Sequence, residues 1–333
     1  MKVRDSFFDV VKMAAIFMVV FGHVQTASEM IWGAPYIKNF IIGVNMPLFF
    51  TISGYFVHQM DAPGSWKYLV KRVASLLWPA LVVSMILCIA KIVLAGHVEF
   101  WALEWLWGKF VSFWFLWVLS GCVLIGYCMD RVHIRGGVIL LCASLMFMPS
   151  ERFYADKILQ MLPFFMMGRY LLDDMINAIK RFRGLGLTCI YAYTLIILFS
   201  GNVYDNGMGF YWNHVSWIEL LKNSNSVILW IARFATAVIG VFAVLYVFDV
   251  GMKFNVLRKL SCLGTTTLGV YILHQDILTL ISPILSPNPM VVFAMSVVLL
   301  LFCHFLIMIT KKINWINAFL WEFPRKVVGG RAG

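Results

Sequence analysis

Three ionisable residues occupy one long apolar stretch near the start of the chain. Residues 7–27, FFDVVKMAAIFMVVFGHVQTA, are apolar enough to cross a bilayer, yet they include Asp9, Lys12 and His23. A charged side chain at the centre of a membrane helix costs about 2.5–3.5 kcal/mol on insertion scales, so such residues usually have a function. An imidazole can accept and return a proton near neutral pH, and it is therefore the strongest catalytic candidate of the three.

The spacing of these residues predicts that they lie along one face of a helix. Lys12 and His23 are eleven positions apart, which corresponds to about three helical turns and about 16 Å along the axis. Asp9 precedes Lys12 by three residues and is placed to pair with it. Two structural alternatives remain open: Lys12 could extend to the headgroups while Asp9 neutralises it, and His23 could be a packing residue. A signal peptide is disfavoured, because the apolar run is long and the expected cleavage motif is missing.

Composition predicts a multi-pass membrane protein. Of the 333 residues, 62% are hydrophobic and only 13% are charged, with many long apolar runs. The formal net charge is +11, but the basic residues lie in short loops between the apolar runs, where they indicate topology and contact with anionic membrane lipid rather than nucleic acid. The seven cysteines lie almost wholly in apolar runs and show no metal-ligand spacing, so we expect neither a metal site nor a disulfide framework.

Hydropathy predicts an all-α chain of about ten transmembrane helices, organised as a single domain over residues 1–333. Most lysines and arginines fall on one side if both termini are cytoplasmic, which is the arrangement that the positive-inside rule favours. The basic residues 311–333 form a cytoplasmic tail, and the outer loop 201–225 carries aromatic residues suited either to the membrane interface or to sugars. The predicted spans are 7–27, 38–57, 73–95, 111–129, 136–149, 157–172, 185–200, 226–249, 263–283 and 290–310.

Two further spans carry polar groups that could line a cavity beside the first helix. In the second span, Pro47 interrupts the backbone hydrogen bonding and polar side chains flank it. The pair Ser53 and Gly54 in that span would let another helix approach closely. In the ninth span, His274 and Asp276 could not both face lipid at low cost, and His274 fits a packing role and a site role equally well.

Several of these segments together resemble the membrane-bound acyltransferase-3 family, with the fucose 4-O-acetylase-like branch the most similar. The resemblance covers nearly the whole chain in the same order. Lys12 stands where many members have Arg, Asn45 where the branch often has His, and Ser75 where a basic cluster usually continues. The segments that carry it are FFDVVKMAAIFMVVFGHV (7–24), NMPLFFTISGYFV (45–57), KRVASLLWP (71–79), FWFLWVL (113–119), LPFFMMGRYL (162–171) and LGTTTLGVYILH (263–274).

The resemblance implies an enzyme that transfers an acyl group, usually acetyl, from cytoplasmic acyl-CoA to a carbohydrate hydroxyl. No permanently bound cofactor is implied; acetyl-CoA is the donor substrate, and the acceptor is a surface or lipid-linked glycan. The basic-x10-His motif maps onto Lys12 and His23, with Asp9 beside Lys12 and His23 as general base. Lys71 and Arg72 would attract the phosphates of CoA. The remaining candidates for binding substrate are Asn45, Ser53, Tyr55 and His274.

The resemblance also implies the cytoplasmic membrane of a bacterium as the location, and it is compatible with a homo-oligomer. Two rival classes stay open from the residues alone. A transporter of a sugar or a proton-coupled solute could use the intramembrane acids and histidines as a proton relay, although no internal repeat is evident. A non-catalytic sensor or scaffold could share the fold, because fold does not fix function.

Overall fold

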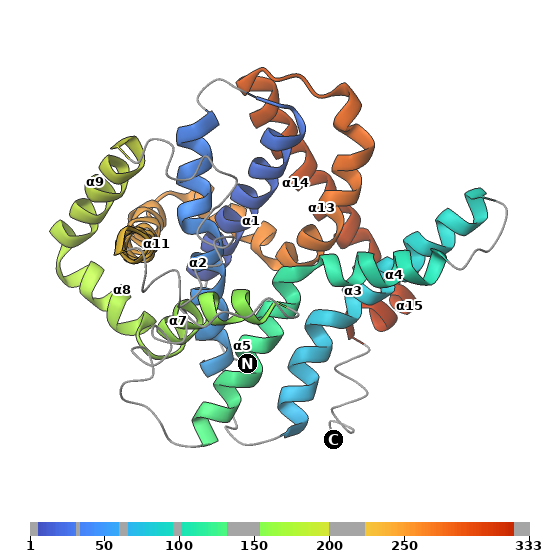
Figure 1. The fold of residues 1–333 in the computed structure, drawn as a ribbon, viewed down its shortest axis with the longest axis horizontal. Helices are drawn as coiled ribbons and strands as arrows, with labels where there is room; N and C mark the ends of the chain where they lie inside the picture. Colours follow the sequence, from blue (N-terminus) through green and yellow to red (C-terminus); the bar gives the residue numbers. More distant parts are fainter. Residues whose placement is uncertain are drawn as a thin grey trace. The chain divides into compact units, whose positions relative to one another are not determined.

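The structure is a computed structural model that describes residues 6–30, 34–59, 66–95, 101–131, 154–199 and 224–322. Every regular element within these ranges is helical, and none of the described residues forms a strand (Figure 1). Among the residues that the structure describes, six helices are long and apolar enough to span a bilayer, or eight if each of two bent helix pairs counts as one span. The chain is therefore an all-α, multi-pass membrane protein.

The chain divides into two compact units. Unit 1 comprises Met1–Met60 and Gly136–His304. Helix α14 (Pro289–Lys312) runs past the end of unit 1. The other elements of unit 1 are α1 (Ser6–Ala27), α2 (Ala34–Gln59), α7 (Ala155–Tyr170), α8 (Leu172–Arg181), α9 (Arg183–Phe199), α11 (Ser224–Gly251), α12 (Asn255–Lys259), the 3-10 turn η2 (Leu260–Thr266), α13 (Thr267–Ile281) and the 3-10 turn η3 (Ser282–Ile284).

Unit 2 comprises Asp61–Arg135 and Phe305–Gly333. The indole Nε1 of Trp78 donates to the backbone carbonyl of Phe319 at 2.8 Å, and the two rings meet edge to face. This contact ties the segment that follows α14 to α3. The helices of unit 2 are α3 (Trp66–Ala95), α4 (Trp101–Ser112), α5 (Trp114–Arg131), α15 (Asn314–Ile316) and the π-helical turn η4 (Asn317–Glu322).

The crossing of α2 and α7 in unit 1 depends on two glycines. A Cβ atom on Gly54 would overlap the backbone carbonyl of Phe165, and one on Gly168 would overlap the carbonyl of Thr51. Each glycine thus faces the backbone of the opposite helix, which lets the two helices approach more closely than side chains would allow. The close approach predicted at Ser53 and Gly54 is confirmed, and its partner is α7.

Helix α9 is connected to α2 through Tyr193. Its hydroxyl donates to the backbone carbonyl of Phe40 at 2.7 Å, and its ring packs edge to face on the Phe40 ring. A Cβ atom on Gly240 of α11 would lie 2.7 Å from the Tyr193 ring. Tyr193 therefore fills the space between α2 and α11, and it helps to fix the frame that holds α1.

The predicted spans agree best with the structure where a single straight helix forms the whole span. Residues 7–27 and 290–310 correspond closely to α1 and α14. The predicted span 111–129 corresponds to α5 together with the last two residues of α4, and α4 meets α5 at a 60° bend. Residues 185–200 are α9, which forms a second bent pair with α8 at 104°. The predicted spans 38–57, 73–95, 226–249 and 263–283 lie within or across longer helical elements, 157–172 is the 16-residue α7, and 136–149 lies outside the described residues.

Candidate functional site

Helix α1 is the element around which the candidate site is built. It is unbroken from Ser6 to Ala27, so the helical spacing used to relate Lys12 to His23 applies to it. The helix contains no proline, carries an acidic residue in its first turn, and ends before Glu29, whose φ of 54° is left-handed. It contacts α2, α11, α12, η2 and α13. The residues of α1 therefore face several other elements of unit 1.

At one end of α1, Lys12 lies between a carboxylate and an aromatic ring. Its Nζ is 3.5 Å from Oδ1 of Asp9 and 3.8 Å from the centroid of the Phe56 ring on α2. Asp9 is buried, and Lys12 is half-buried. The predicted pairing of Asp9 with Lys12 is confirmed, and the cation–π contact with Phe56 adds a second partner from a different helix.

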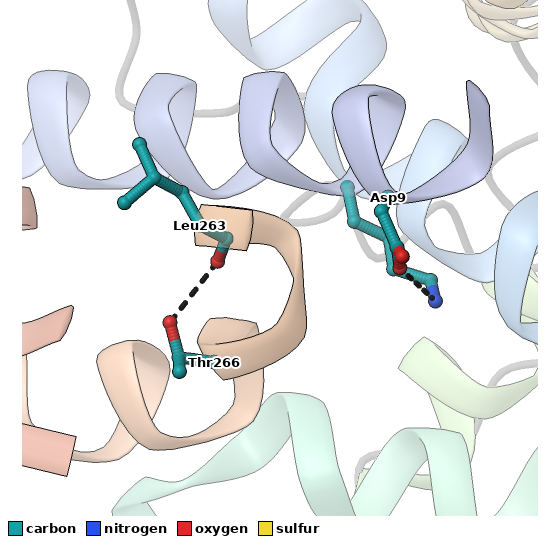
Figure 2. A network of polar contacts seen from close by, with 4 residues as sticks. Asp9, Leu263 and Thr266 are labelled. Carbon is teal, nitrogen blue, oxygen red and sulfur yellow. Dashed lines mark hydrogen bonds and ion pairs between the residues drawn. The ribbon is translucent and has the colours of Figure 1, made fainter. Parts of the chain in front are cut away.

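The turn η2 packs directly against the backbone of α1 at Asp9. A Cβ atom on Gly264 would overlap the carbonyl of Asp9, so only glycine permits this approach. Figure 2 shows Leu263 and Thr266 in this turn, on the same side of α1 as Asp9; the Thr266 hydroxyl donates to the carbonyl of Leu263 at 3.0 Å. Because that hydroxyl has a single hydrogen, Nδ1 of His304, 2.8 Å away, must donate to it. Helix α14 thus braces the turn that supports Asp9.

Towards the other end of α1, His23 meets a second histidine. The ring centroids of His23 and His274 on α13 are 5.2 Å apart, with the planes tilted by 46°. His274 is buried, and its Nδ1 lies 2.9 Å from the backbone carbonyl of Val270. A carbonyl can only accept, so Nδ1 of His274 carries the hydrogen. His23 is exposed at the surface of unit 1, so a hydroxyl could approach it.

Helix α2 runs antiparallel to α1 and carries three of the predicted substrate-binding residues at different levels. The rings of Phe8 and Tyr55 stack with centroids 4.5 Å apart, whereas a Cβ atom on Gly22 would lie 3.6 Å from Ile41. This register puts Ser53 and Tyr55 beside the Asp9 end of α1. Asn45 falls between the levels of Lys12 and His23, and its Oδ1 accepts the backbone N–H of Met46 at 2.7 Å.

Lys71 and Arg72, the residues predicted to attract the donor phosphates, lie on α3 and belong to unit 2. Both side chains are half-buried. Arg72 also accepts, through its backbone carbonyl, a hydrogen bond from the Ser75 hydroxyl at 2.8 Å. Their predicted role in attracting the donor phosphates stays a prediction.

Within unit 1, the predicted site residues form two groups on α1. Asp9 and Lys12 share one end with Tyr55, and His23 and His274 share the other. The described residues contain no cluster of three or more His, Cys, Asp or Glu side chains able to hold a metal ion. A cation and an imidazole along one helix suit group transfer by acid–base chemistry, in which one end holds an anionic substrate and the other moves a proton.

Sequence reasoning did not identify the residues that hold these groups in place. Phe56, Gly264 and the pair Thr266–His304 each contact the site or its support. Gly264 and Thr266 stand within LGTTTLGVYILH, a segment noted only for its resemblance, and its glycine followed by threonines was the available signal. Phe56 could not be selected, because the aromatic residues around it are equivalent until the rotation of α2 is known.

Comparison with known proteins identifies the family of this chain. Residues 5–309 match the acyltransferase-3 family, described as an acyltransferase domain, which covers α1 through most of α14. Comparison with curated proteins and with solved structures gave no match. Because the family match extends over most of the chain and includes both histidines, the chain belongs to the acyltransferase-3 family and is a multi-pass membrane acyltransferase.

Proposed function

We propose that the protein transfers an acyl group, with acetyl as the favoured group, from cytoplasmic acyl-CoA to a hydroxyl of a surface or lipid-linked carbohydrate. The observation that carries the proposal is the contact between His23 and His274 on the same helix that bears the Asp9–Lys12 pair. The family match independently supports acyl transfer. We assign the protein to the cytoplasmic membrane of a bacterium, with both termini cytoplasmic.

In the proposed reaction, His23 is the general base. Its imidazole takes the proton of the carbohydrate hydroxyl while the oxygen attacks the thioester carbonyl. The carbon–sulfur bond then breaks, and the CoA sulfur leaves and takes up that proton. An ester and free CoA result, and His23 returns to its neutral form. His274 contacts the His23 ring, and it would orient that ring and hold the acceptor beside it.

The donor would enter from the Lys12 end of α1. A pantetheine arm is about as long as the separation of Lys12 from His23, about 16 Å, so the thioester could reach the imidazole while the nucleotide stays outside. Lys71 and Arg72 would attract the phosphates. Asn45 lies between the two ends and is the best placed residue of α2 to hold the thioester oxygen, and Ser53 and Tyr55 would line the donor path beside Lys12.

The proposal is tested by following labelled acetyl groups. The protein would be reconstituted in vesicles with acetyl-CoA labelled in the acetyl group, beside a parallel measurement of sugar uptake by the same vesicles. We expect acetyl-CoA consumption and no sugar flux; flux without acetyl-CoA consumption would instead support a transporter. Ester analysis of surface polysaccharide from cells with and without the protein would then name the acceptor.

Lys12 provides a test of the donor side. Lys12→Ala removes the cation that faces Asp9 and the Phe56 ring, and it leaves Asp9 buried without this counter-charge. We expect Lys12→Ala to reduce acyl transfer by about 100-fold, an effect of about 2.7 kcal/mol, because the charge-assisted contact with the anionic donor is lost. Lys12→Arg preserves the charge and should retain at least a tenth of the activity, which is about a 1.4 kcal/mol effect. Equal losses in the two variants, measured as initial rates, would contradict a role for positive charge.

A further inference from the structure

A short basic segment links α11 to η2. This segment, the basic turn, consists of residues 252–260, MKFNVLRKL. Lys253, Arg258 and Lys259 are all exposed in it. The one acidic residue nearby in the sequence, Asp249, lies at the end of α11 and is half-buried. The basic turn therefore presents a net positive surface.

Hydrogen bonds give the basic turn a defined shape. Nε of Arg258 donates to the backbone carbonyl of Met252 at 2.7 Å, which fixes the guanidinium across the turn. The backbone N–H of Phe254 donates to the carbonyl of Gly251 at 2.9 Å. An arginine whose guanidinium is already oriented loses less conformational freedom when it binds an oxyanion than a mobile lysine does.

The basic turn lies at the Lys12 end of α1. Both α12 and η2 contact α1, and η2 contacts it at Asp9, where Gly264 meets the carbonyl. The turn and α1 belong to the same compact unit. Its three exposed cations thus gather at the end of the site where the proposed donor enters, and Lys12 lies further inside.

We infer that the basic turn binds the phosphate groups of the donor nucleotide, an inference that rests on the proposed use of acyl-CoA. Lysine and arginine form short, charge-assisted hydrogen bonds with phosphate oxygens, and arginine can do so with two parallel bonds. The same turn also exposes Phe254 and Val256, and a segment that combines exposed apolar and basic side chains is typical of a membrane interface. Phosphate is also the headgroup chemistry of anionic lipids, so the test must separate the two sources.

The test measures binding of CoA, with no acceptor required. The turn variant is Lys253→Gln, Arg258→Gln and Lys259→Gln together. The matched control is Lys180→Gln, Arg181→Gln and Arg183→Gln, which removes the same charge from exposed positions on α8 and α9. We expect the Kd of CoA to rise about tenfold in the turn variant and less than about twofold in the control, because only the turn loses charge-assisted bonds to phosphate.

Dephospho-CoA and lipid composition identify the source of the phosphate. For dephospho-CoA, which lacks one phosphate group, the turn variant should lose less affinity than it does for CoA. Measurements in nanodiscs of phosphatidylcholine alone, and again with phosphatidylglycerol, distinguish a lipid site. If the variant loses only its preference for phosphatidylglycerol and binds CoA like the wild type, the inference is overturned. If the wild type and the turn variant transferred acyl groups at the same rate, this inference alone would be overturned. If the wild type did not bind CoA, the proposed function would be overturned as well.

Discussion

Replacing His23 with alanine is expected to lower the rate of acyl transfer by about 10³-fold, within the range that a general base contributes. The substitution removes the imidazole from its contact with His274 and leaves no group at that position to take the hydroxyl proton. Because His23 is exposed, its truncation opens no buried cavity, and the protein should insert and fold as before. The measurement is the initial rate of label transfer in vesicles, normalised to folded protein.

A second histidine offers the matched control. His304 is bonded to Thr266 through Nδ1 and braces η2 without facing the reacting groups. His304→Ala should lower the thermal stability of the purified protein and leave most of the transfer rate per folded molecule. Transfer that persists in His23→Ala at the wild-type rate would remove His23 from the mechanism, and equal losses in both variants would reduce its role to a structural one.

The largest effect on stability is expected at the glycines where α2 crosses α7. Gly54→Ala and Gly168→Ala each place a methyl group on a backbone carbonyl of the opposite helix. A backbone cannot move aside as a flexible side chain can, so the helices must separate. We expect each substitution to lower the free energy of unfolding by about 3 kcal/mol, the upper part of the range for overpacking. Thermal unfolding in detergent, followed by circular dichroism, measures the change.

Gly184 serves as the control for these two positions. A Cβ atom there would meet no neighbouring atom within 4 Å. Alanine in a helix is favoured over glycine by about 1 kcal/mol, so Gly184→Ala should be neutral or slightly stabilising. If Gly54→Ala matched Gly184→Ala in unfolding temperature, the close crossing of α2 and α7 would not exist in the folded protein.

The sequence predicted the straight membrane helices and failed where the chain bends. Hydropathy averages over a window, and it records α14 well because that helix is apolar throughout and surrounded by polar ends. The same average cannot register a change of direction, so α4, which meets α5 at a 60° bend, was not predicted beside the span at 111–129. A span was predicted at 157–172, where α7 lies, but the burial of α7 against α2 depends on Gly54 and Gly168, each of which meets the backbone of the opposite helix. This contact joins two segments that are far apart in the sequence, so neither segment alone predicts it.

For the site, the local relationships were predictable and the long-range ones were not. Asp9 and Lys12 are three residues apart, and helical geometry alone pairs them. His23 and His274 lie on helices far apart in sequence, and each was selected because an ionisable side chain in an apolar run is unusual. Nothing in either segment specifies that the two rings meet. That contact depends on η2, whose glycine allows the chain to pack against α1 and then continue as α13.

The short helix α7 also has a consequence for how the protein is made. With 16 residues and buried Lys157, Gln160 and Arg169, it is too short and too polar to settle in hydrocarbon by itself. Its stable position requires the close contact with α2 at Gly54, which exists only after α2 has been inserted. We therefore expect α1 and α2 to insert into the membrane first, and α7 to take its place only afterwards by packing against α2.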